Sequence, residues 1–448
     1  MPLIRSISGL RATLGDALTP AVVADYTAAF AAMLPDGPIV VGRDGRPSGS
    51  WINDIVIGAL RASGRHVSVL DMVPTPTVQL LTEHSDAVGG ISITASHNPA
   101  PWNGLKFIGG DGVFLDATAN AELWARVDGK RFALSDQQQS GSVENVVDAI
   151  DRHINAIMAL PAVATAPSAG GQTVVVDAVN CSGSVIVPAL LRRMGYTVVE
   201  LYCNGNGKFP HVPEPLAENL VDLGNAVRAH DAVMGVAVDP DADRLVLFDE
   251  HGEPIGEERT IALAAEAVLR SDAAGSVIVN YSTSRMVDDV AAKYGCLTHR
   301  AAVGEINVVR RMQAEHAVIG GEGSGGVILP ACHYGRDAMV GIGLITSMLR
   351  STQRTMSQAV ADMPSYSMLK TKITVDNADQ AALLLERVAA RFDDGVVSRE
   401  DGIHVSYSDR WLHVRTSNTE PILRIIVEAP DAAAAATMLA DIQQQRTL

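Results

Sequence analysis

Short Val-rich apolar runs alternate along the chain with longer helical segments. The same order appears three times: an apolar run, a helical segment, a glycine that opens a second run, and an Ala-Val phrase that leads into a polar loop. The three phrases are residues 86–90, 231–235 and 316–320. An internal repeat implies similar units that pack together, so we expect the three loops to face one cleft.

Each repeat predicts a strand, a helix and a return strand. In that order, the predicted ranges are 38–41, 50–63 and 64–70 in the first unit, 173–176, 184–194 and 195–201 in the second, and 277–280, 284–294 and 295–300 in the third. Glycine after a helix suits a left-handed cap, and Val-rich runs are typical of buried strands. Strand–helix–strand order predicts right-handed crossovers onto largely parallel sheets.

The pattern changes from about residue 367. A strand at 370–375, a helix at 378–392, a hairpin at 404–414, a strand at 422–428 and an Ala-rich terminal helix predict a small α+β domain with an antiparallel sheet. Joints are expected at 161–171, which is rich in Ala, Pro, Ser and Gly, and near 251–254. We therefore expect an α/β protein: three similar α/β domains with mixed, largely parallel sheets plus a smaller C-terminal α+β domain, with the active site in the central cleft. The expected bounds are 1–150, 151–253, 254–366 and 367–448.

Composition narrows the class of protein. The 448 residues are 47% hydrophobic and 19% charged, as in a globular chain, and the net charge of −16 speaks against a nucleic-acid or anionic-membrane surface. The four cysteines are widely spaced, which argues against disulfides and a structural zinc. No signal peptide is evident and no run of 18 apolar residues occurs, so the sequence predicts a soluble cytoplasmic protein without membrane or nucleic-acid partners.

The first repeat loop carries a hydroxyl group in a polar setting. Ser96 directly follows an apolar strand and is flanked by His97, Asn98 and Pro99. A serine hydroxyl can act as a nucleophile when it is activated, or it can carry a phosphoryl group covalently. Taken alone, the Ser-His-Asn-Pro sequence is more typical of an ordinary turn than of a catalytic loop.

The second repeat loop carries alternate carboxylates, Asp239, Asp241 and Asp243. Alternate residues of an extended segment point the same way, so three carboxylates converge and would repel one another unless a cation such as Mg²⁺ or Ca²⁺ joins them. An EF-hand is excluded because Arg244 stands where its loop needs glycine, and the chain continues as an apolar strand. An exposed acidic turn is the remaining alternative.

Two further loops favour a phosphorylated sugar. Glu322 and Ser324 lie among five glycines, which let the backbone approach a ligand, although the loop lacks the Lys-Ser/Thr of a nucleotide P-loop. In the C-terminal segment, two arginines flank a polar turn and predict a phosphate clamp, with a solvated hairpin tip as the alternative. The residues of this clamp are Arg415, Ser417, Asn418, Thr419 and Arg424.

Together these loops resemble the α-D-phosphohexomutase family over essentially the whole chain. Residues 94–99 resemble its phosphoserine loop, followed by 103–106, while residues 239–244 resemble its metal loop and 321–325 its sugar loop. Residues 415–424 resemble its phosphate-binding loop, and 8–11 its amino-terminal motif, whose arginine reaches the active site.

The chain departs from this family pattern at several positions. Pro240 and Ala242 stand where the metal loop more often has glycine, and Ala12 replaces the second glycine of the amino-terminal motif. Several family members carry a histidine where this chain has Gly326, so a proton-transfer role for that histidine does not carry over; His333 is a candidate substitute. The sequence around Gly326 and at 333–337 looks most like a bacterial and archaeal branch labelled phosphoglucosamine mutase or phosphomannomutase.

The resemblance implies an isomerase that interconverts hexose 6-phosphate and hexose 1-phosphate through a phosphoserine and a bisphosphorylated sugar. Mg²⁺ would be held by the three aspartates and a phosphate oxygen on Ser96, and sugar 1,6-bisphosphate would be the activator. The implied roles are transition-state stabilisation by Arg11 and Arg244, proton transfer or serine orientation by Lys106 and His97, sugar binding by Glu322 and Ser324, and phosphate binding by Arg415, Ser417, Asn418, Thr419 and Arg424.

The expected substrate is glucosamine phosphate, with mannose or glucose phosphate as the alternative. A serine-dependent metal phosphatase and a non-catalytic sugar-phosphate binder are the competing interpretations, and the phosphate clamp argues against the phosphatase. The chain is expected to be a monomer or a homodimer.

Overall fold

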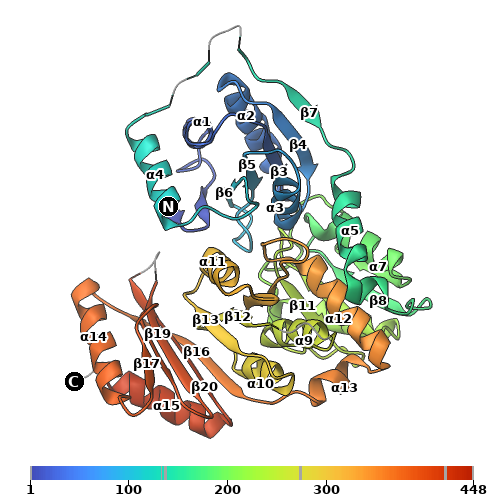
Figure 1. Cartoon of the computed structure of the whole chain (residues 1–448), viewed down its shortest axis with the longest axis vertical. Helices are drawn as coiled ribbons and strands as arrows, with labels where there is room; N and C mark the ends of the chain where they lie inside the picture. The colour runs from blue at the N-terminus through green and yellow to red at the C-terminus, as the bar shows by residue number, and fades with distance from the viewer. Residues whose placement is uncertain (1–2, 133, 136–138, 272–274, 418–420, 446–448) are drawn as a thin grey trace.

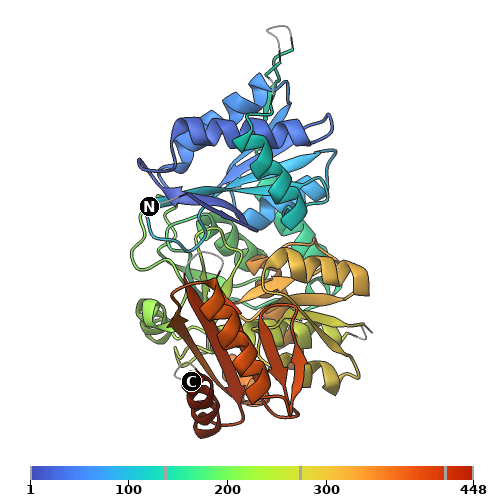
Figure 2. The same ribbon diagram turned by 90° about the vertical axis from the view of Figure 1, so that its left-hand side faces the viewer.

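The computed structural model describes residues 3–132, 134–135, 139–271, 275–417 and 421–445. Within these ranges the strands form four sheets, each with helices of its own. Figures 1 and 2 show the first unit, in blue, at one end of the molecule and the C-terminal unit, in red, at the other. The second unit, in green, and the third unit, in yellow, lie beside each other below the first unit in Figure 1.

The first unit has the strand order β1-β2-β6-β5-β3-β4-β7. Strands β5, β3, β4 and β7 pair in parallel, whereas β1, β2, β6 and β5 pair antiparallel. Its elements are β1 (Ile4–Ser6), β2 (Gly9–Thr13), α1 (Pro20–Met33), β3 (Ile39–Arg43), α2 (Gly49–Ala62), β4 (Val67–Met72), α3 (Thr75–Glu83), β5 (Gly89–Ile93), β6 (Trp102–Gly109), α4 (Ala117–Asp128) and β7 (Val143–Asn145).

The second unit has the strand order β11-β10-β8-β9, and the third has β13-β12-β14-β15. The second comprises α5 (Ala149–Ala159), α6 (Pro161–Ala164), β8 (Thr173–Asp177), α7 (Gly183–Arg193), β9 (Thr197–Leu201), η1 (Ala217–Asn219), α8 (Val221–Ala229), β10 (Met234–Val238) and β11 (Leu245–Phe248). The third comprises α9 (Glu257–Leu269), β12 (Val277–Asn280), α10 (Met286–Lys293), β13 (Thr298–Ala301), α11 (Glu305–Glu315), β14 (Ile319–Glu322), β15 (Gly326–Ile328), α12 (Ala338–Thr352) and α13 (Met356–Ala361).

The predicted repeat is confirmed by the topology. In each of these sheets the return strand, the first strand, the strand of the Ala-Val phrase and an antiparallel partner lie in that order: β4-β3-β5-β6, β9-β8-β10-β11 and β13-β12-β14-β15. Each chemical loop therefore follows the equivalent strand, β5, β10 or β14, and leads into the antiparallel partner. The short helix α6 lies within the segment expected to be a joint.

The C-terminal unit is a fully antiparallel sheet of order β16-β20-β19-β18-β17. Its elements are β16 (Ser367–Thr374), α14 (Ala378–Arg391), β17 (Val396–Ser398), β18 (Ile403–Ser406), β19 (Trp411–Thr416), β20 (Ile422–Ala429) and α15 (Ala432–Gln444). The predicted α+β class is confirmed, and the edge strand β17 is an addition that the sequence pattern did not indicate.

The hydrophobic cores show which units pack together and which has a core of its own. One apolar cluster runs from α3 and α5 through the sheets of the second and third units, so these parts pack as a continuous body. The C-terminal unit has a separate core between its sheet and the helices α14 and α15. In the part of the chain that is described, no helix combines the length and the apolar character needed to cross a bilayer.

Candidate active site

The three repeat loops and the C-terminal sheet open onto one cleft of about 630 Å³. Its wall receives side chains from all four units. Those predicted from the sequence are Arg11, His97, Arg244, Glu322, Ser324, Arg415 and Arg424, and further lining residues include Asn98, Glu214, Glu257, Glu258, Arg336 and Lys370. The expectation that equivalent loops meet at a central cleft is therefore met by the geometry.

Ser96 lies at the junction between the first loop and the aspartate loop. Its hydroxyl donates to Asp239 Oδ2 at 3.1 Å, and its Oγ lies 3.2 Å from His97 Nδ1. The backbone of Ser96 has φ +49°, a left-handed conformation that costs a non-glycine residue roughly 1 kcal/mol. Its N–H donates to Thr94 Oγ1 at 2.9 Å, so the surrounding loop fixes this strained position.

Arg46 holds the serine loop in place, and sequence reasoning missed it. The guanidinium is buried and donates to the backbone carbonyls of Ser96 at 2.5 Å and Asn98 at 2.6 Å. Its Nε donates to Asp44 Oδ2, which also accepts from the hydroxyl of Thr94. The only available signal was a charged Gly-Arg-Asp-Gly-Arg segment at residues 42–46, which begins in the last two residues of β3.

The aspartate loop follows β10, and its three aspartates are fully buried. The Asp239 Oδ1 accepts from the backbone N–H groups of Asp243 and Arg244, while Lys106 Nζ donates to Asp241 Oδ2 at 2.6 Å and Asp243 Oδ2 at 3.1 Å. Within the described residues, Asp241 Oδ1 and Asp243 Oδ1 have no hydrogen-bond partner. One oxygen from each aspartate lies within 4.8 Å of the others, so the donor set fits a hard divalent cation.

The electrostatics of the loop support a cation at this position. Burial and the carboxylates of Asp243 and Asp241 raise the pKa of Asp239 well above its ordinary value. Burial would also raise the pKa of Asp243, but Arg336 and Lys106 outweigh it and lower that pKa. A divalent cation between the carboxylates would offset their repulsion and favour the ionised form of Asp239.

The two candidates for proton transfer differ in charge. Burial, followed by the positive charges of Arg244 and Arg11, lowers the pKa of His97 to about 2, so its imidazole is neutral. Burial would lower the pKa of Lys106, but Asp241 and Asp243 outweigh it and raise that pKa. His97 can thus accept a hydrogen bond beside Ser96, whereas Lys106 contributes a fixed positive charge to the aspartate loop.

The sugar loop contributes Glu322, which ends β14. Its Oε1 accepts from Asn280 Nδ2 at 2.9 Å and its Oε2 accepts from Arg336 Nη1 at 2.5 Å. Burial would raise the pKa of Glu322, but Arg336 outweighs this effect and lowers it, so the side chain is an ionised acceptor. Ser324 follows in the turn before β15 and lines the cleft.

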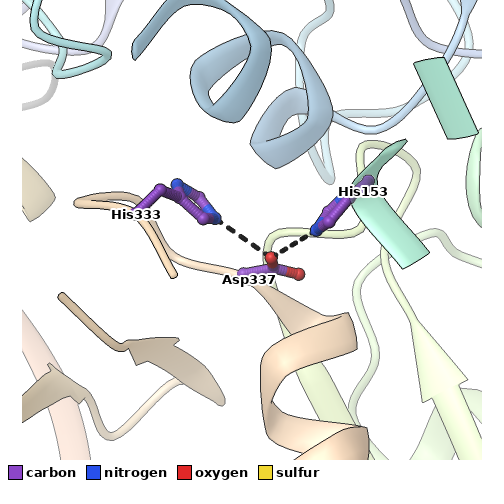
Figure 3. Close-up of side chains that lie close together, drawn as sticks. All are labelled: His153, His333 and Asp337. Carbon is purple, nitrogen blue, oxygen red and sulfur yellow. Dashed lines mark hydrogen bonds and ion pairs between the residues drawn. The ribbon is translucent and has the colours of Figure 1, made fainter. Parts of the chain in front are cut away.

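The suggestion that His333 substitutes for the histidine missing at Gly326 is wrong in geometric terms. His333 is 1% exposed, does not line the cleft, and has its Nε2 3.0 Å from Asp337 Oδ2. Figure 3 shows it turned toward Asp337 together with His153. The space beside Gly326 is filled by Arg336 instead, since a Cβ at Gly326 would lie 2.4 Å from Arg336 Cδ.

Four arginines predicted from the sequence line the cleft: Arg11, Arg244, Arg415 and Arg424. Arg415 and Arg424 occupy directly opposed positions on β19 and β20. Burial and then the nearby Arg424 lower the pKa of Arg415, with Asp401 acting in the opposite direction. Arg11 Nη1 donates to Asn98 Oδ1 at 3.0 Å beside the serine loop. The Arg244 side chain lies between Asp243 and Glu214.

Part of the predicted clamp cannot be placed. Ser417 is half-buried at the end of β19, and its N–H donates to the carbonyl of Ile422 at 3.0 Å. Asn418 and Thr419 lie outside the described residues.

Comparison with known proteins gives consistent matches along the chain. Residues 4–134, 151–252 and 257–366 match the phosphoglucomutase/phosphomannomutase alpha/beta/alpha domains I, II and III, and residues 371–445 match the C-terminal domain of that group. A phosphoglucomutase/phosphomannomutase of Thermococcus kodakarensis is 35% identical over 427 residues, covering 94% of this chain and 93% of the relative. A protein described as a probable phosphoglucosamine mutase of Methanopyrus kandleri is 34% identical over 430 residues, with the same coverage of each chain.

A solved structure agrees with these sequence matches. The crystal structure of a phosphoglucomutase/phosphomannomutase family protein from Burkholderia thailandensis has a TM-score of 0.87 to this chain at 26% identity. The similarity covers 99% of this chain and 97% of that one, so the whole four-unit architecture is shared.

Proposed function

Because the chain belongs to the phosphoglucomutase/phosphomannomutase family of phosphohexomutases, which are isomerases, we propose that it interconverts glucosamine 6-phosphate and glucosamine 1-phosphate. The observation that carries the proposal is that Ser96 donates to Asp239 of the aspartate loop, while their loop neighbours His97 and Arg244 line the same cleft as Glu322 and the opposed arginines Arg415 and Arg424. These groups supply a phosphoryl carrier, a cation site, a sugar contact and a phosphate clamp.

Ser96 is the proposed phosphoryl carrier. In the first half-reaction the phosphorus–oxygen bond to Ser96 Oγ breaks and a bond to the free hydroxyl of the hexose monophosphate forms, which gives a bisphosphate and unmodified Ser96. The bisphosphate then turns around and returns its other phosphoryl group to Ser96. Serine phosphate and a hexose 6-phosphate are both esters of alcohols, so the exchange between them is close to balanced in free energy.

The aspartate loop is the proposed metal site of this metal-dependent family. Asp239, Asp241 and Asp243, together with a phosphate oxygen on Ser96, would hold Mg²⁺, which supplies charge neutralisation at the transferring phosphoryl group. Lys106 and Arg336 occupy Oδ2 of Asp243 and leave its Oδ1 without a partner among the described residues. The protein therefore orients the carboxylate oxygens toward one point.

The remaining residues position the sugar phosphate. Arg11 and Arg244 face the serine and aspartate loops and can stabilise charge on the transferring group. Arg415, Ser417, Asn418, Thr419 and Arg424 are proposed to hold the phosphate that is not reacting. His97 is proposed to orient the Ser96 hydroxyl, and a sugar 1,6-bisphosphate is the proposed activator that phosphorylates Ser96.

Two observations support glucosamine as the sugar. The relative from Methanopyrus kandleri is described as a probable phosphoglucosamine mutase. The cleft wall also carries Glu214, whose carboxylate lies 4.0 Å from Arg244 and can accept a hydrogen bond from an ammonium group. Mannose or glucose phosphate is the alternative, because the relative from Thermococcus kodakarensis is named phosphoglucomutase/phosphomannomutase.

The proposal is tested by assaying the 1-phosphates of glucosamine, mannose and glucose side by side with Mg²⁺ and the matching 1,6-bisphosphate. We expect conversion to the 6-phosphate with kcat/KM highest for glucosamine. A higher kcat/KM for mannose or glucose would reject the proposed sugar. Release of inorganic phosphate in place of the 6-phosphate would instead identify a phosphatase.

A further inference from the structure

Arg336 links three loops of the cleft. Its side chain is 11% exposed, and its guanidinium donates to three carboxylates: Asp243 at 2.6 Å, Glu305 at 3.0 Å and Glu322 at 2.5 Å. Asp243 belongs to the aspartate loop, Glu322 to the sugar loop, and Glu305 begins α11. Because these carboxylates outweigh the effect of burial, the pKa of Arg336 is raised well above its ordinary value and the side chain stays charged.

Gly326 makes the position of Arg336 possible. It lies directly opposite Glu322 in the β14–β15 hairpin, and an added Cβ would lie 2.4 Å from Arg336 Cδ and 3.0 Å from Arg336 Cγ. Contacts this short require one of the two groups to move. A side chain at position 326 and the observed position of Arg336 therefore exclude each other.

The backbone next to Arg336 is anchored by a buried cluster (Figure 3). Asp337 Oδ2 lies 2.7 Å from His153 Nε2 and 3.0 Å from His333 Nε2, and Asp337 Oδ1 accepts from the first N–H groups of α12. Both carboxylate oxygens thus serve hydrogen bonds that fix the start of this helix. His153 comes from α5, so the anchor ties the Arg336 turn to a separate part of the fold.

Arg336 also retains hydrogen-bonding capacity toward the cleft. A guanidinium has five N–H groups. Within the described ranges, the three carboxylate contacts use one N–H on each of its nitrogens, which leaves one on Nη1 and one on Nη2. Arg336 lines the cleft between Glu322 and the aspartate loop, where a hexose bound at Glu322 would lie.

We propose that Arg336 is a substrate-positioning residue of this chain, which donates an N–H to a hexose oxygen and fixes Glu322 relative to the aspartate loop, and that Gly326 is required to make room for it. The inference rests on the proposed phosphoryl transfer to a hexose phosphate. In this proposal Arg336 places the accepting hydroxyl of the hexose next to the Ser96 phosphoryl group. Transfer to sugar depends on this placement, whereas loss of the phosphoryl group to water does not.

The test compares transfer of the Ser96 phosphoryl group to the sugar with its hydrolysis by water, in one enzyme preparation. Enzyme phosphorylated on Ser96 with labelled glucosamine 1,6-bisphosphate is freed of excess ligand and mixed with saturating glucosamine 1-phosphate or with buffer alone. Label is then followed into sugar phosphate and into inorganic phosphate. The variants are Arg336→Gln, Arg336→Ala, Gly326→Ala and the combination of the two alanine substitutions, because alanine lacks the Cγ and Cδ atoms that a Cβ at position 326 would meet. Arg354→Gln is the control, because Arg354 pairs with Glu266 and Asp362 outside the cleft.

We expect Arg336→Gln to slow transfer to the sugar at least about tenfold, as for the loss of a charge-assisted hydrogen bond, while hydrolysis stays within about threefold of wild type. Gly326→Ala should slow transfer similarly, and it should add little in the combined variant because its effect acts through Arg336. Arg354→Gln should transfer at the wild-type rate.

Wild-type transfer by Arg336→Gln would overturn the inference. So would equal losses in transfer and hydrolysis, which would indicate a role confined to the aspartate loop, or a full additional loss from Gly326→Ala when Arg336 is already absent. If wild-type phosphoenzyme transfers label to no hexose phosphate, the proposed function fails, and this result is distinct from any difference between variants.

Discussion

Arg415 and Arg424 lie directly opposite each other on the antiparallel strands β19 and β20, and both side chains line the cleft. Like charges at opposed positions of a sheet destabilise the pairing, so this arrangement carries a cost in the absence of an anion. A phosphate dianion between the guanidinium groups would offset their repulsion and accept charge-assisted hydrogen bonds from both.

Replacing Arg424 with Gln should therefore weaken binding of the phosphate that is not reacting. We expect KM to rise about tenfold or more with glucosamine 1-phosphate and also with glucosamine 6-phosphate, because the intermediate presents each end to the clamp in turn. Steady-state kinetics with each isomer as substrate measure the change in KM. Arg410→Gln, in the turn before β19 and outside the cleft, is the control. Impairment with only one isomer would contradict reorientation of the intermediate.

Ser96→Ala should abolish turnover while the protein keeps its fold. Among the described residues, the hydroxyl has hydrogen-bonding contacts to Asp239 and His97 alone, so its loss removes the proposed phosphoryl carrier without removing packed apolar atoms. Intact-mass analysis should find one phosphoryl group on wild-type protein after incubation with the bisphosphate and none on the variant. Turnover by Ser96→Ala close to the wild-type rate would rule out the phosphoserine mechanism.

Asp241→Asn should weaken Mg²⁺ binding because it removes one of three charges from the aspartate loop. It also weakens the ion pair between Asp241 and Lys106. Titration calorimetry should show a lower affinity for Mg²⁺, and activity should recover in part at higher Mg²⁺ concentration. Asp177→Asn, at a buried aspartate paired with His211, is the matched control. Activity that responds neither to a chelator nor to Asp241→Asn would remove the cation from the mechanism.

Asp337 should contribute to stability in a pH-dependent way. Burial would raise its pKa, but His153 and His333 outweigh this effect and lower it. A carboxyl whose pKa is depressed by folding stabilises the protein fully above its ordinary pKa of about 3.9, and this contribution is lost as the pH falls toward the folded value.

Urea unfolding should therefore find Asp337→Asn less stable than wild type by about 3 kcal/mol at pH 7, the usual cost of breaking a buried pair. The difference should shrink below about pH 4, where the wild-type carboxyl is protonated on unfolding. Asp111→Asn, at an exposed ion pair with Arg310, should change stability much less at either pH. A deficit for Asp337→Asn of the same size at both pH values would contradict the assignment.

The parts of the site that follow strands could be predicted from the sequence. Ser96 and the aspartates come after an Ala-Val strand and Glu322 is the last residue of one, and equivalent strand ends in a repeat lie at equivalent edges of similar sheets. The polar residues of each loop are neighbours in the sequence, so the local pattern was sufficient to predict that they lie together. The predicted hairpin covered residues 404–414, so the sequence did not predict that Arg415 and Arg424 lie directly opposite each other on β19 and β20.

Arg46 and Arg336 could not be assigned in the same way. Arg46 acts on carbonyl groups about fifty residues later in the chain, and Arg336 acts on Asp243, which is 93 residues earlier. Neither contact leaves a periodic or local pattern, because each depends on how separate units pack. The strand β17 was missed for a related reason: its three residues pair only at a sheet edge.

The central claim is that Ser96 passes a phosphoryl group to a hexose phosphate, and the fate of a labelled phosphoryl group tests it most directly. Enzyme labelled on Ser96 is mixed with unlabelled glucosamine 6-phosphate and Mg²⁺, and the products are separated at times within one turnover. The account predicts that label leaves the protein into glucosamine 1,6-bisphosphate first and then appears in hexose monophosphate. Label that leaves the protein mainly as inorganic phosphate, or that stays on the protein while isomerisation proceeds, would contradict it.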